Sequence, residues 1–479
     1  MKKTGAVTAA SVLEIAGRRR IAGVVAAVIG TCFVAVAGTA DAETVPQPTR
    51  GDIQVRRLLV TEGGAQSIRL VKDPRNDTLY LLKQNGDVFR VDLSPPTKTL
   101  VYSRADHGVR ITQGMAIGGD GTIYLVGNGD APKTRTRGRI VKGVVNGTGG
   151  RTWSILAQTA AYPRSATAYD HRLNGIVVEP GGQSILVNSG SRTDHGEEQS
   201  AGGLFPGLRE SGVTACILRL PTSGRNLVLP DNRATLRKRG YIFAEGTRNT
   251  FDMAYGPNGD LFGSENGPDR DMPDELNWLR AGRHYGFPWR IGGLANPQQF
   301  SPYDPAADKL LNPMFNAVWR GYYHDDPQFP QKPVNLVLTE PIANAGPNAD
   351  SFRSESTGAI LDASTQGTTI ASFTAHRTPL GLVFDREGAL GADLTGDGFI
   401  LGWTVGDPTG DTVAGPFKDP GQDLLHLQLT NRASGYRMTA TRIVGGFNNP
   451  IDAELVGHTL YVLDNGGSQS IWEVILPAK

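Results

Sequence analysis

The chain has 479 residues, and its 48 lysine and arginine side chains nearly balance 47 aspartate and glutamate side chains, for a formal net charge of +1. No basic excess is available to bind a phosphate backbone, so we expect no nucleic acid partner. Only Cys32 and Cys216 are present. Because Cys32 lies in a segment that we expect to be removed, no intrachain disulfide is expected.

Residues 1–42 have the pattern of an export signal. A basic region that ends at Arg18-Arg19-Arg20 precedes an apolar stretch over residues 21–37, and Ala40-Asp41-Ala42 follows. This order is typical of a cleaved signal peptide. An uncleaved membrane anchor is the alternative, although the apolar run is slightly short for a span. We expect a periplasmic or secreted protein without stable membrane insertion after cleavage.

Residues 43–479 repeat one pattern, in which an apolar alternating strand, a turn of Gly, Asp or Asn and a second β-rich strand follow one another. The copies begin near residues 68, 114, 175, 251, 381 and 452. Small antiparallel sheets that recur in this way are typical of a β-propeller with one repeat per blade. The sequence therefore predicts an all-β, six-bladed β-propeller of four-stranded antiparallel blades. A two-sheet sandwich is the alternative, and the recurrence of one hairpin disfavours it.

The spacing between copies is uneven. Residues 290–378, between the fourth and fifth copies, form a connection far longer than one between blades requires. Long insertions on propellers usually decorate one face, often the binding face. We expect this segment to line a pocket or to cover a neighbouring blade.

The fourth copy contains the densest group of polar residues. It reads as short strands over residues 251–255 and 260–262, joined by Asn258-Gly259, the dipeptide favoured in type I′ hairpin turns. The polar loop that follows is not expected to extend a strand. It carries six oxygen-bearing side chains within eleven positions: Glu265, Asn266, Asp269, Asp271, Asp274 and Glu275. Such density suits Ca²⁺, which takes about six to eight oxygen ligands; a solvated acidic loop is the alternative.

This region resembles one family. The Arg248-Asn249 pair, the hairpin, Ser-Glu-x-Gly-Pro at 264–268, Asp-Glu-Leu-Asn at 274–277 and Gly-x-x-Tyr-Gly-x-Pro at 282–288 are similar to the fourth blade of the glucose/sorbosone dehydrogenases. That family consists of six-bladed propellers that use the quinone cofactor PQQ and Ca²⁺. The resemblance implies a sugar substrate and an external electron acceptor that reoxidises the cofactor.

Two candidate catalytic groups stand at the start of repeats. His171, preceded by Asp170, begins the third copy, where an imidazole with a neighbouring carboxylate can act as a general base. The matching Asp-His pair of the family orients the sugar and takes the proton of its anomeric hydroxyl. His195 is the second candidate. Arg248 presents a planar fork that suits a carboxylate or a quinone oxygen, or alternatively a salt bridge between blades.

The resemblance also implies the cofactor and metal residues. Arg248 and Asn249 match the pair that contacts PQQ, and Gly267 and Pro268 match the carbonyl groups that ligate Ca²⁺. Asp274, Glu275 and Tyr285 match positions that lie near the cofactor or hold a second Ca²⁺ in the family. Asn266 stands at a cofactor position where the glucose enzymes carry Gln, a change of one methylene group.

The sequence also departs from the family pattern. The glucose enzymes of the family hold the anionic cofactor with a lysine on the fifth blade and an Arg-x-Arg before the sixth, and residues 398–405 and 446–452 contain neither. Each lost charge-assisted hydrogen bond is worth about 1.5–3 kcal/mol. Arg377 and Lys418 are the candidate replacements. A second function therefore stays open: a non-redox propeller that binds carbohydrate or protein, or a Ca²⁺-dependent, lactonase-like hydrolase.

Overall fold

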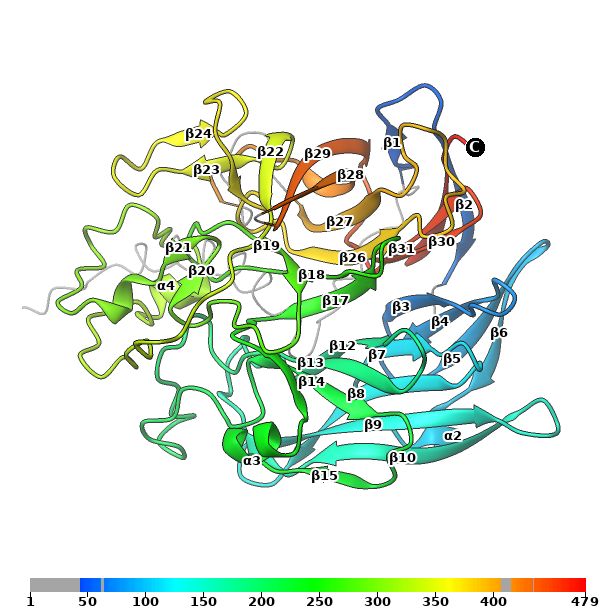
Figure 1. Ribbon diagram of the computed structural model, residues 1–479, viewed down its shortest axis with the longest axis horizontal. Helices are drawn as coiled ribbons and strands as arrows, with labels where there is room; N and C mark the ends of the chain where they lie inside the picture. The colour runs from blue at the N-terminus through cyan, green and yellow to red at the C-terminus, as the bar shows by residue number, and fades with distance from the viewer. Residues whose placement is uncertain (1–43, 62–63, 406–414, 434) are drawn as a thin grey trace, which may run out of the picture.

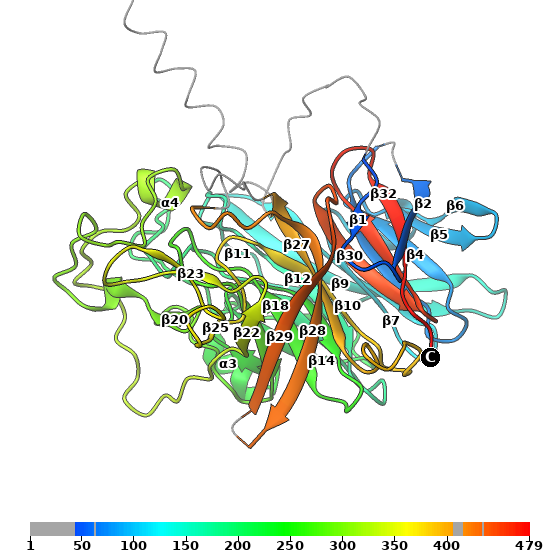
Figure 2. The same ribbon diagram turned by 90° about the horizontal axis from the view of Figure 1, so that it is seen from above.

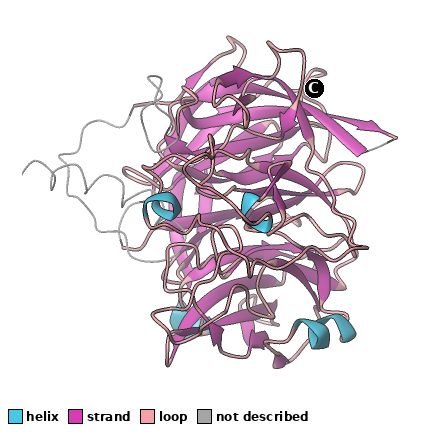
Figure 3. Ribbon diagram, turned by 90° about the vertical axis from the view of Figure 1, so that its left-hand side faces the viewer, coloured by secondary structure: helices cyan, strands magenta, loops and turns pink. Residues whose placement is uncertain are grey.

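A computed structural model describes residues 44–61, 64–405, 415–433 and 435–479. The expected signal over residues 1–42 lies outside these ranges. Antiparallel sheets surround a central axis, and the few helices are short (Figures 1 and 3). Within the described ranges, no helix is long and apolar enough to cross a membrane.

The sheets follow one another along the chain (Figure 1). The first contains β3 (Ser67–Lys72), β4 (Leu79–Lys83), β5 (Val88–Leu93) and β6 (Pro96–Tyr102). The second contains β7 (Thr112–Ile117), β8 (Ile123–Ala131), β9 (Arg135–Val145) and β10 (Arg151–Thr159), extended by β11 (Tyr162–Pro163) and β15 (Leu227–Leu229). The third contains β12 (Leu173–Val178), β13 (Ser184–Ser189), β14 (Cys216–Pro221) and β16 (Ile242–Glu245).

The second half of the chain forms three further sheets around the axis. The fourth contains β17 (Thr250–Tyr255), β18 (Leu261–Glu265) and β19 (Glu275–Leu279). The fifth contains β26 (Pro379–Phe384), β27 (Gly398–Val405), β28 (Gly421–Arg432) and β29 (Gly435–Gly445), extended by β22 (Ala343–Pro347), β25 (Ile370–Ala371) and β1 (Gln47–Pro48). The last contains β30 (Pro450–Val456), β31 (Thr459–Asp464), β32 (Ser470–Ile475) and β2 (Gln54–Val60).

The prediction of an all-β propeller is confirmed, but the blades are not uniformly four-stranded. In the described part of the chain, five sheets have four or more strands, whereas the β17–β19 sheet has three. The reason lies in the insertion after β19, whose strand β22 pairs in parallel with β29 of the next sheet. Strand β22 of the insertion therefore joins the edge of a neighbouring sheet. The long β28–β29 hairpin reaches beyond the other sheets (Figure 2).

The insertion carries only short elements of its own. These are β20 (Arg290–Ile291) with β21 (Leu294–Ala295), β23 (Ser351–Arg353) with β24 (Ile360–Asp362), a 3-10 helix η1 (Pro297–Gln299) and α4 (Asn316–Trp319). There are two other short helices in the described ranges. Helix α2 (Arg104–His107) contacts β6 and β10, and helix α3 (Arg233–Lys238) lies between β15 and β16 in the chain.

The first strands of the sheets form the wall of a central channel. They contact one another in the closed order β3, β7, β12, β17, β26 and β30, and β30 contacts β3 again. Each of these strands has a shift of register near its start, and the first unpaired residues are equivalent: Ile68, Gln113, Asn174, Phe251, Leu380 and Ile451. A Cβ atom added to Gly175 would lie 2.5 Å from the carbonyl oxygen of Phe251, so glycine permits the close packing of neighbouring strands there.

The β17–β18 hairpin differs from the prediction in two respects. Tyr255 pairs with Leu261, so five residues form the loop, and among Asn258 and Gly259 only Gly259 has a positive φ, of 84°. A type I′ turn requires positive φ at both central residues, so this prediction is wrong. Strand β18 also continues through Ser264 to Glu265, because both residues pair with β19 in the interior.

Candidate functional site

The candidate residues lie where the inner strands begin. His171 precedes β12, Arg248 precedes β17, and Arg377 precedes β26. Because these strands surround one channel and run in the same direction, their starts meet at one end of it. The loop after β18, which contains Asn266, Gly267 and Pro268, lies at the same end and contacts Arg248.

His171 is buried, and its contacts set its tautomer. Its Nδ1 lies 3.2 Å from the carbonyl oxygen of Ser191 and 3.1 Å from the Ser191 hydroxyl. That hydroxyl donates to the Thr193 carbonyl, so it accepts the proton that Nδ1 carries. Nε2 therefore presents a lone pair. Burial, and then the charge of Arg248, lower the pKa of His171 to about 3, which keeps the ring neutral at neutral pH.

Asp170 does not orient His171, contrary to the expectation from sequence. Its carboxylate accepts hydrogen bonds from the backbone N–H groups of Ser165 and Ala166 at 2.7 and 3.0 Å and lies 3.5 Å from Arg164 Nε. Ser191 is the group that positions the imidazole instead.

Two nitrogens of the Arg248 guanidinium donate to Asp194, which the sequence analysis did not single out. Its Nε donates to the Asp194 carbonyl at 2.7 Å, and its Nη2 donates to Asp194 Oδ1 at 3.0 Å. Nη1 makes longer contacts, 3.1 Å to the Asn266 carbonyl and 3.5 Å to His171 Nε2. A hydrogen-bond donor and a lone-pair acceptor from two different blades thus meet at one point.

Asp194 is the centre of a buried network behind Arg248. It accepts from His195 Nδ1 at 2.9 Å, from the Asp269 backbone at 3.1 Å and from the Tyr323 hydroxyl at 3.3 Å. The other nitrogen of His195 contacts Gln298 Oε1 at 2.8 Å. Both His195 nitrogens therefore have partners, and its ring stacks on Tyr323 with centroids 3.8 Å apart. His195 supports the site rather than facing a ligand.

The Asp194-His195 dipeptide is the one feature of the sequence that could have indicated this buried network. It repeats the Asp-His order of residues 170–171, but nothing local in the sequence links it to Arg248, 54 positions away. Asp269 is a further member that sequence reasoning placed only in the acidic loop. Burial, and then the charge of Asp194, raise its pKa to about 6, and it accepts hydrogen bonds from the Tyr169 hydroxyl and the Ala317 backbone.

Asn249 belongs to a ladder of buried amides. Asn188 donates to Asn174 at 2.7 Å, Asn174 donates to Asn249 at 2.7 Å, and Asn249 donates to Asn266 at 2.8 Å. The ladder connects the third sheet to the loop after β18. It fixes the position of the Asn266 backbone, whose carbonyl contacts Arg248.

The expected Ca²⁺ loop is braced by Asp274. The two oxygens of its carboxylate accept from the backbone N–H of Gly267 at 2.6 Å and of Thr378 at 2.8 Å. Burial raises the pKa of Asp274. Asp274 thus ties residues 266–268 to the start of β26. The carbonyl groups of Gly267 and Pro268 supply oxygen donors, which is the chemistry that a hard cation prefers.

The structure places Glu275 and Tyr285 away from these carbonyl groups. Glu275 pairs in register with Glu265 across β18 and β19, and its carboxylate accepts from Asn277 and the Gly292 backbone. Burial raises the pKa of Glu265 to about 7, and burial and Glu265 raise that of Glu275 to about 8. The Tyr285 hydroxyl donates to the Trp278 carbonyl at 2.7 Å within a core cluster.

In the described ranges, no group of three or more His, Cys, Asp or Glu side chains is placed to hold a metal ion. The Glu275 carboxylate and the Tyr285 hydroxyl are engaged in internal hydrogen bonds, as described above. The expected binding of Ca²⁺ by Gly267 and Pro268 involves backbone carbonyl groups, so the absence of such a side-chain group does not bear on it.

Arg377 and Lys418, the candidate replacements for the lysine and arginines that hold the cofactor in the family, differ in burial and in their ion pairs. Arg377 is buried and forms ion pairs with Asp419 and Asp423, which also pair with Arg442. Its charge is therefore balanced inside the protein. Lys418 is exposed.

The fold and the site define a β-propeller with a buried His–Arg pair at one end of its channel. The sequence profile of the family described as Glucose / Sorbosone dehydrogenase matches residues 120–320, a range that contains every candidate site residue except Arg377 and Lys418. The resemblance stated from the sequence is thus confirmed over this range. No curated protein matches the chain.

Two solved structures show the same fold. The apo-form of the soluble aldose sugar dehydrogenase from Escherichia coli is 14% identical, with a TM-score of 0.54, and the match covers 88% of this chain and 99% of that one. The holo form of the pyranose dehydrogenase PQQ domain from Coprinopsis cinerea is 12% identical, with a TM-score of 0.54, and the match covers 91% and 98%. At these identities the likeness concerns the fold.

Proposed function

We propose that this protein is an exported sugar dehydrogenase that depends on PQQ and Ca²⁺. It would act on a sugar hydroxyl or a hydrated aldehyde and pass electrons to an external acceptor. The observation that carries the proposal is the meeting of His171 Nε2 and Arg248 Nη1, 3.5 Å apart, beside the carbonyl of Asn266. We count the three-stranded β17–β19 sheet, on which Arg248 stands, as one blade of a six-bladed propeller.

The residues fit the reactive part of the cofactor. Arg248 Nη1 takes no part in the hydrogen bonds that anchor the fork to Asp194, so it can donate to a quinone oxygen without their loss. The carbonyl groups of Gly267 and Pro268 would hold Ca²⁺, and Asn249 and Asp274 would fix their positions. When bound, PQQ supplies a two-electron acceptor, which Ca²⁺ polarises.

His171 performs the proton transfer in this proposal. Its neutral ring donates through Nδ1 to Ser191, so its Nε2 lone pair, which lies 3.5 Å from Arg248 Nη1, would accept the proton of a sugar hydroxyl. Burial of the ring excludes water from competing for that position. Arg248 donates to the same point, so it can stabilise negative charge that develops on the reacting oxygen.

The test is a titration of purified apoprotein with PQQ and Ca²⁺, followed by absorbance. We expect uptake that requires both ligands and that Arg248→Met abolishes. Arg239→Met, at an exposed arginine after α3, is the matched control and should bind as the unaltered protein does. A protein that takes up no quinone with Ca²⁺ in excess would exclude the dehydrogenase.

One observation favours a second candidate function. Arg377 pairs with Asp419 and Asp423, so among the described residues it is not available as a cation for the cofactor carboxylates near β26. A Ca²⁺-dependent hydrolase would need the carbonyl loop and His171 without the tricarboxylate. Stabilisation by Ca²⁺ alone, together with hydrolysis of a sugar lactone that His171→Ala removes, would identify this alternative.

A further inference from the structure

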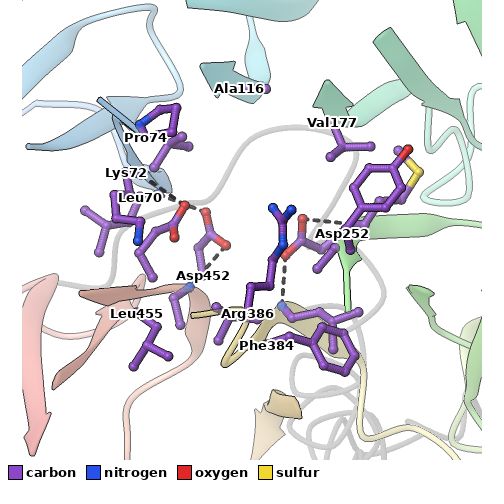
Figure 4. A pocket seen from close by; sticks show the side chains of 18 of the residues that line it. Leu70, Lys72, Pro74, Ala116, Val177, Asp252, Phe384, Arg386, Asp452 and Leu455 are labelled. Carbon is purple, nitrogen blue, oxygen red and sulfur yellow. Dashed lines mark hydrogen bonds between the residues drawn. The ribbon is translucent and has the colours of Figure 1, made fainter. Parts of the chain in front are cut away.

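A cavity of about 490 Å³ opens at the opposite end of the central channel (Figure 4). It is lined by the later residues of the inner strands and by residues next to the hairpin turns, such as Pro74 and Gly457. The candidate site instead lies where these strands begin. The cavity volume falls within the range of about 300–1,000 Å³ that small-molecule pockets occupy.

Arg69 lies in the wall of this cavity with one unused donor. Its Nε donates to the Gln113 carbonyl at 2.9 Å and its Nη2 donates to the Phe251 carbonyl at 2.6 Å, while the guanidinium stacks on the Phe251 ring. Nη1 has no hydrogen-bond partner among the described residues, although the side chain is only 3% exposed. A buried donor without a partner destabilises the folded protein, so an acceptor is expected there.

Two carboxylates face the same nitrogen without reaching it. Asp252 Oδ1 lies 3.8 Å and Asp452 Oδ1 lies 3.9 Å from Arg69 Nη1, beyond hydrogen-bond distance. Each carboxylate is fixed by backbone N–H groups, including those of Leu382 and Leu70 at 2.8 Å. Their oxygens keep lone pairs for further donors. The cavity therefore offers the N–H groups of Arg69 Nη1 and two carboxyl groups in fixed positions.

The rest of the lining is mixed. Apolar side chains, among them Leu70, Val177, Phe384 and Leu455, lie around the cavity in Figure 4. Charged side chains also line it, and Lys72 pairs with Glu387 at 3.1 Å. Apolar side chains can contact the carbon skeleton of an organic ligand while fixed polar groups orient it.

The charges of Arg69, Asp252 and Asp452 select the chemistry of the ligand. An ammonium ion would pair with the carboxylates but would face Arg69 with like charge, and an anion would meet the reverse problem. A hydroxyl group can accept from Arg69 and donate to a carboxylate at the same time. We propose that this cavity is a second binding site, separate from the candidate active site, for a neutral polyhydroxy compound such as a cyclitol or an alditol.

The experiment measures binding of myo-inositol and sorbitol to the purified protein by calorimetry. Neither probe has an anomeric hydroxyl, so oxidation at the other end of the channel does not interfere. Val177→Trp, which fills the cavity, should weaken binding by about tenfold or more, equivalent to about 1.4 kcal/mol. Val101→Trp, at a half-buried position of β6 outside the cavity, is the matched control and should leave binding unchanged.

A second variant keeps the test informative if the first fails to fold. Asp252→Asn preserves the shape of the side chain but removes one charged acceptor, and it should also weaken binding of both polyols. The proposal is overturned if neither polyol binds, if binding persists in Val177→Trp, or if 1,5-diaminopentane or succinate binds in the cavity in their place. Because His171 and Arg248 do not take part, these results are independent of the dehydrogenase test.

Discussion

Replacement of Asp194 tests whether the buried network, rather than Asp170, organises the candidate site. The Asp194 side chain is 0% exposed and that of Arg248 is 3% exposed, with 3.0 Å between Oδ1 and Nη2. In Asp194→Asn, Arg248 loses its anionic partner in the interior, and His195 keeps only Glu197, at 3.5 Å. Removal of one partner from a buried ion pair costs about 3–5 kcal/mol, so we expect a loss of stability of that order.

The assay is denaturant unfolding of Asp194→Asn beside Asp130→Asn. Asp130 pairs with Arg164 at 3.0 Å, but its side chain is 61% exposed, so its loss should cost about 0–1 kcal/mol. Asp170→Asn should leave dye reduction with a sugar less affected than Asp194→Asn does, because Asp170 bonds only the loop around Ser165. Equal stability losses in Asp194→Asn and Asp130→Asn would refute the network.

Three further predictions follow from the channel and its surroundings. Gly175→Ala, whose Cβ would lie 2.5 Å from the Phe251 carbonyl, should lower the unfolding free energy by about 1–3 kcal/mol, whereas Gly119→Ala, with open space around it, should not. Burial raises the pKa of Glu454 from 4.5 to about 7, so the native state holds a proton that the unfolded state releases. Its contribution to stability should therefore decrease as the pH rises from about 4.5 to 7. Glu454→Gln should flatten this part of a plot of melting temperature against pH. An unchanged plot would contradict the assignment. Arg377→Met should destabilise the protein, since Asp419 and Asp423 would share Arg442 as their remaining cationic partner, and should leave the affinity for PQQ unchanged. Lower affinity with unchanged stability would show that Arg377 holds the cofactor instead.

The propeller was predictable because its repeats are local. Each hairpin can be recognised within about fifteen residues, because apolar and polar residues alternate along its strands and turn residues separate them. The inner strand of each sheet was located in this way. The number of strands in each sheet was harder to predict from the sequence. No local pattern shows that β22, from the insertion, pairs with β29 rather than extending the β17–β19 sheet.

The candidate site was predictable only where it follows the chain order of the hairpins. His171 and Arg248 stand directly before inner strands, so their proximity followed from the fold. Asp194 lies in a loop, and its role depends on a contact across 54 positions that leaves no trace in composition. The direction of the Asp170 side chain depends on backbone angles that adjacency in sequence does not specify.

The most direct test of the account is a single-turnover measurement with PQQ, Ca²⁺ and a panel of aldoses. The account predicts sugar-dependent reduction of the cofactor that falls by about 10²-fold or more in His171→Ala, since a positioned general base contributes about that much. His458→Ala, at an exposed histidine in the β30–β31 turn, should react as the unaltered protein does. Equal rates in His171→Ala and His458→Ala would contradict the central claim that the His171–Arg248 pair is the reactive centre.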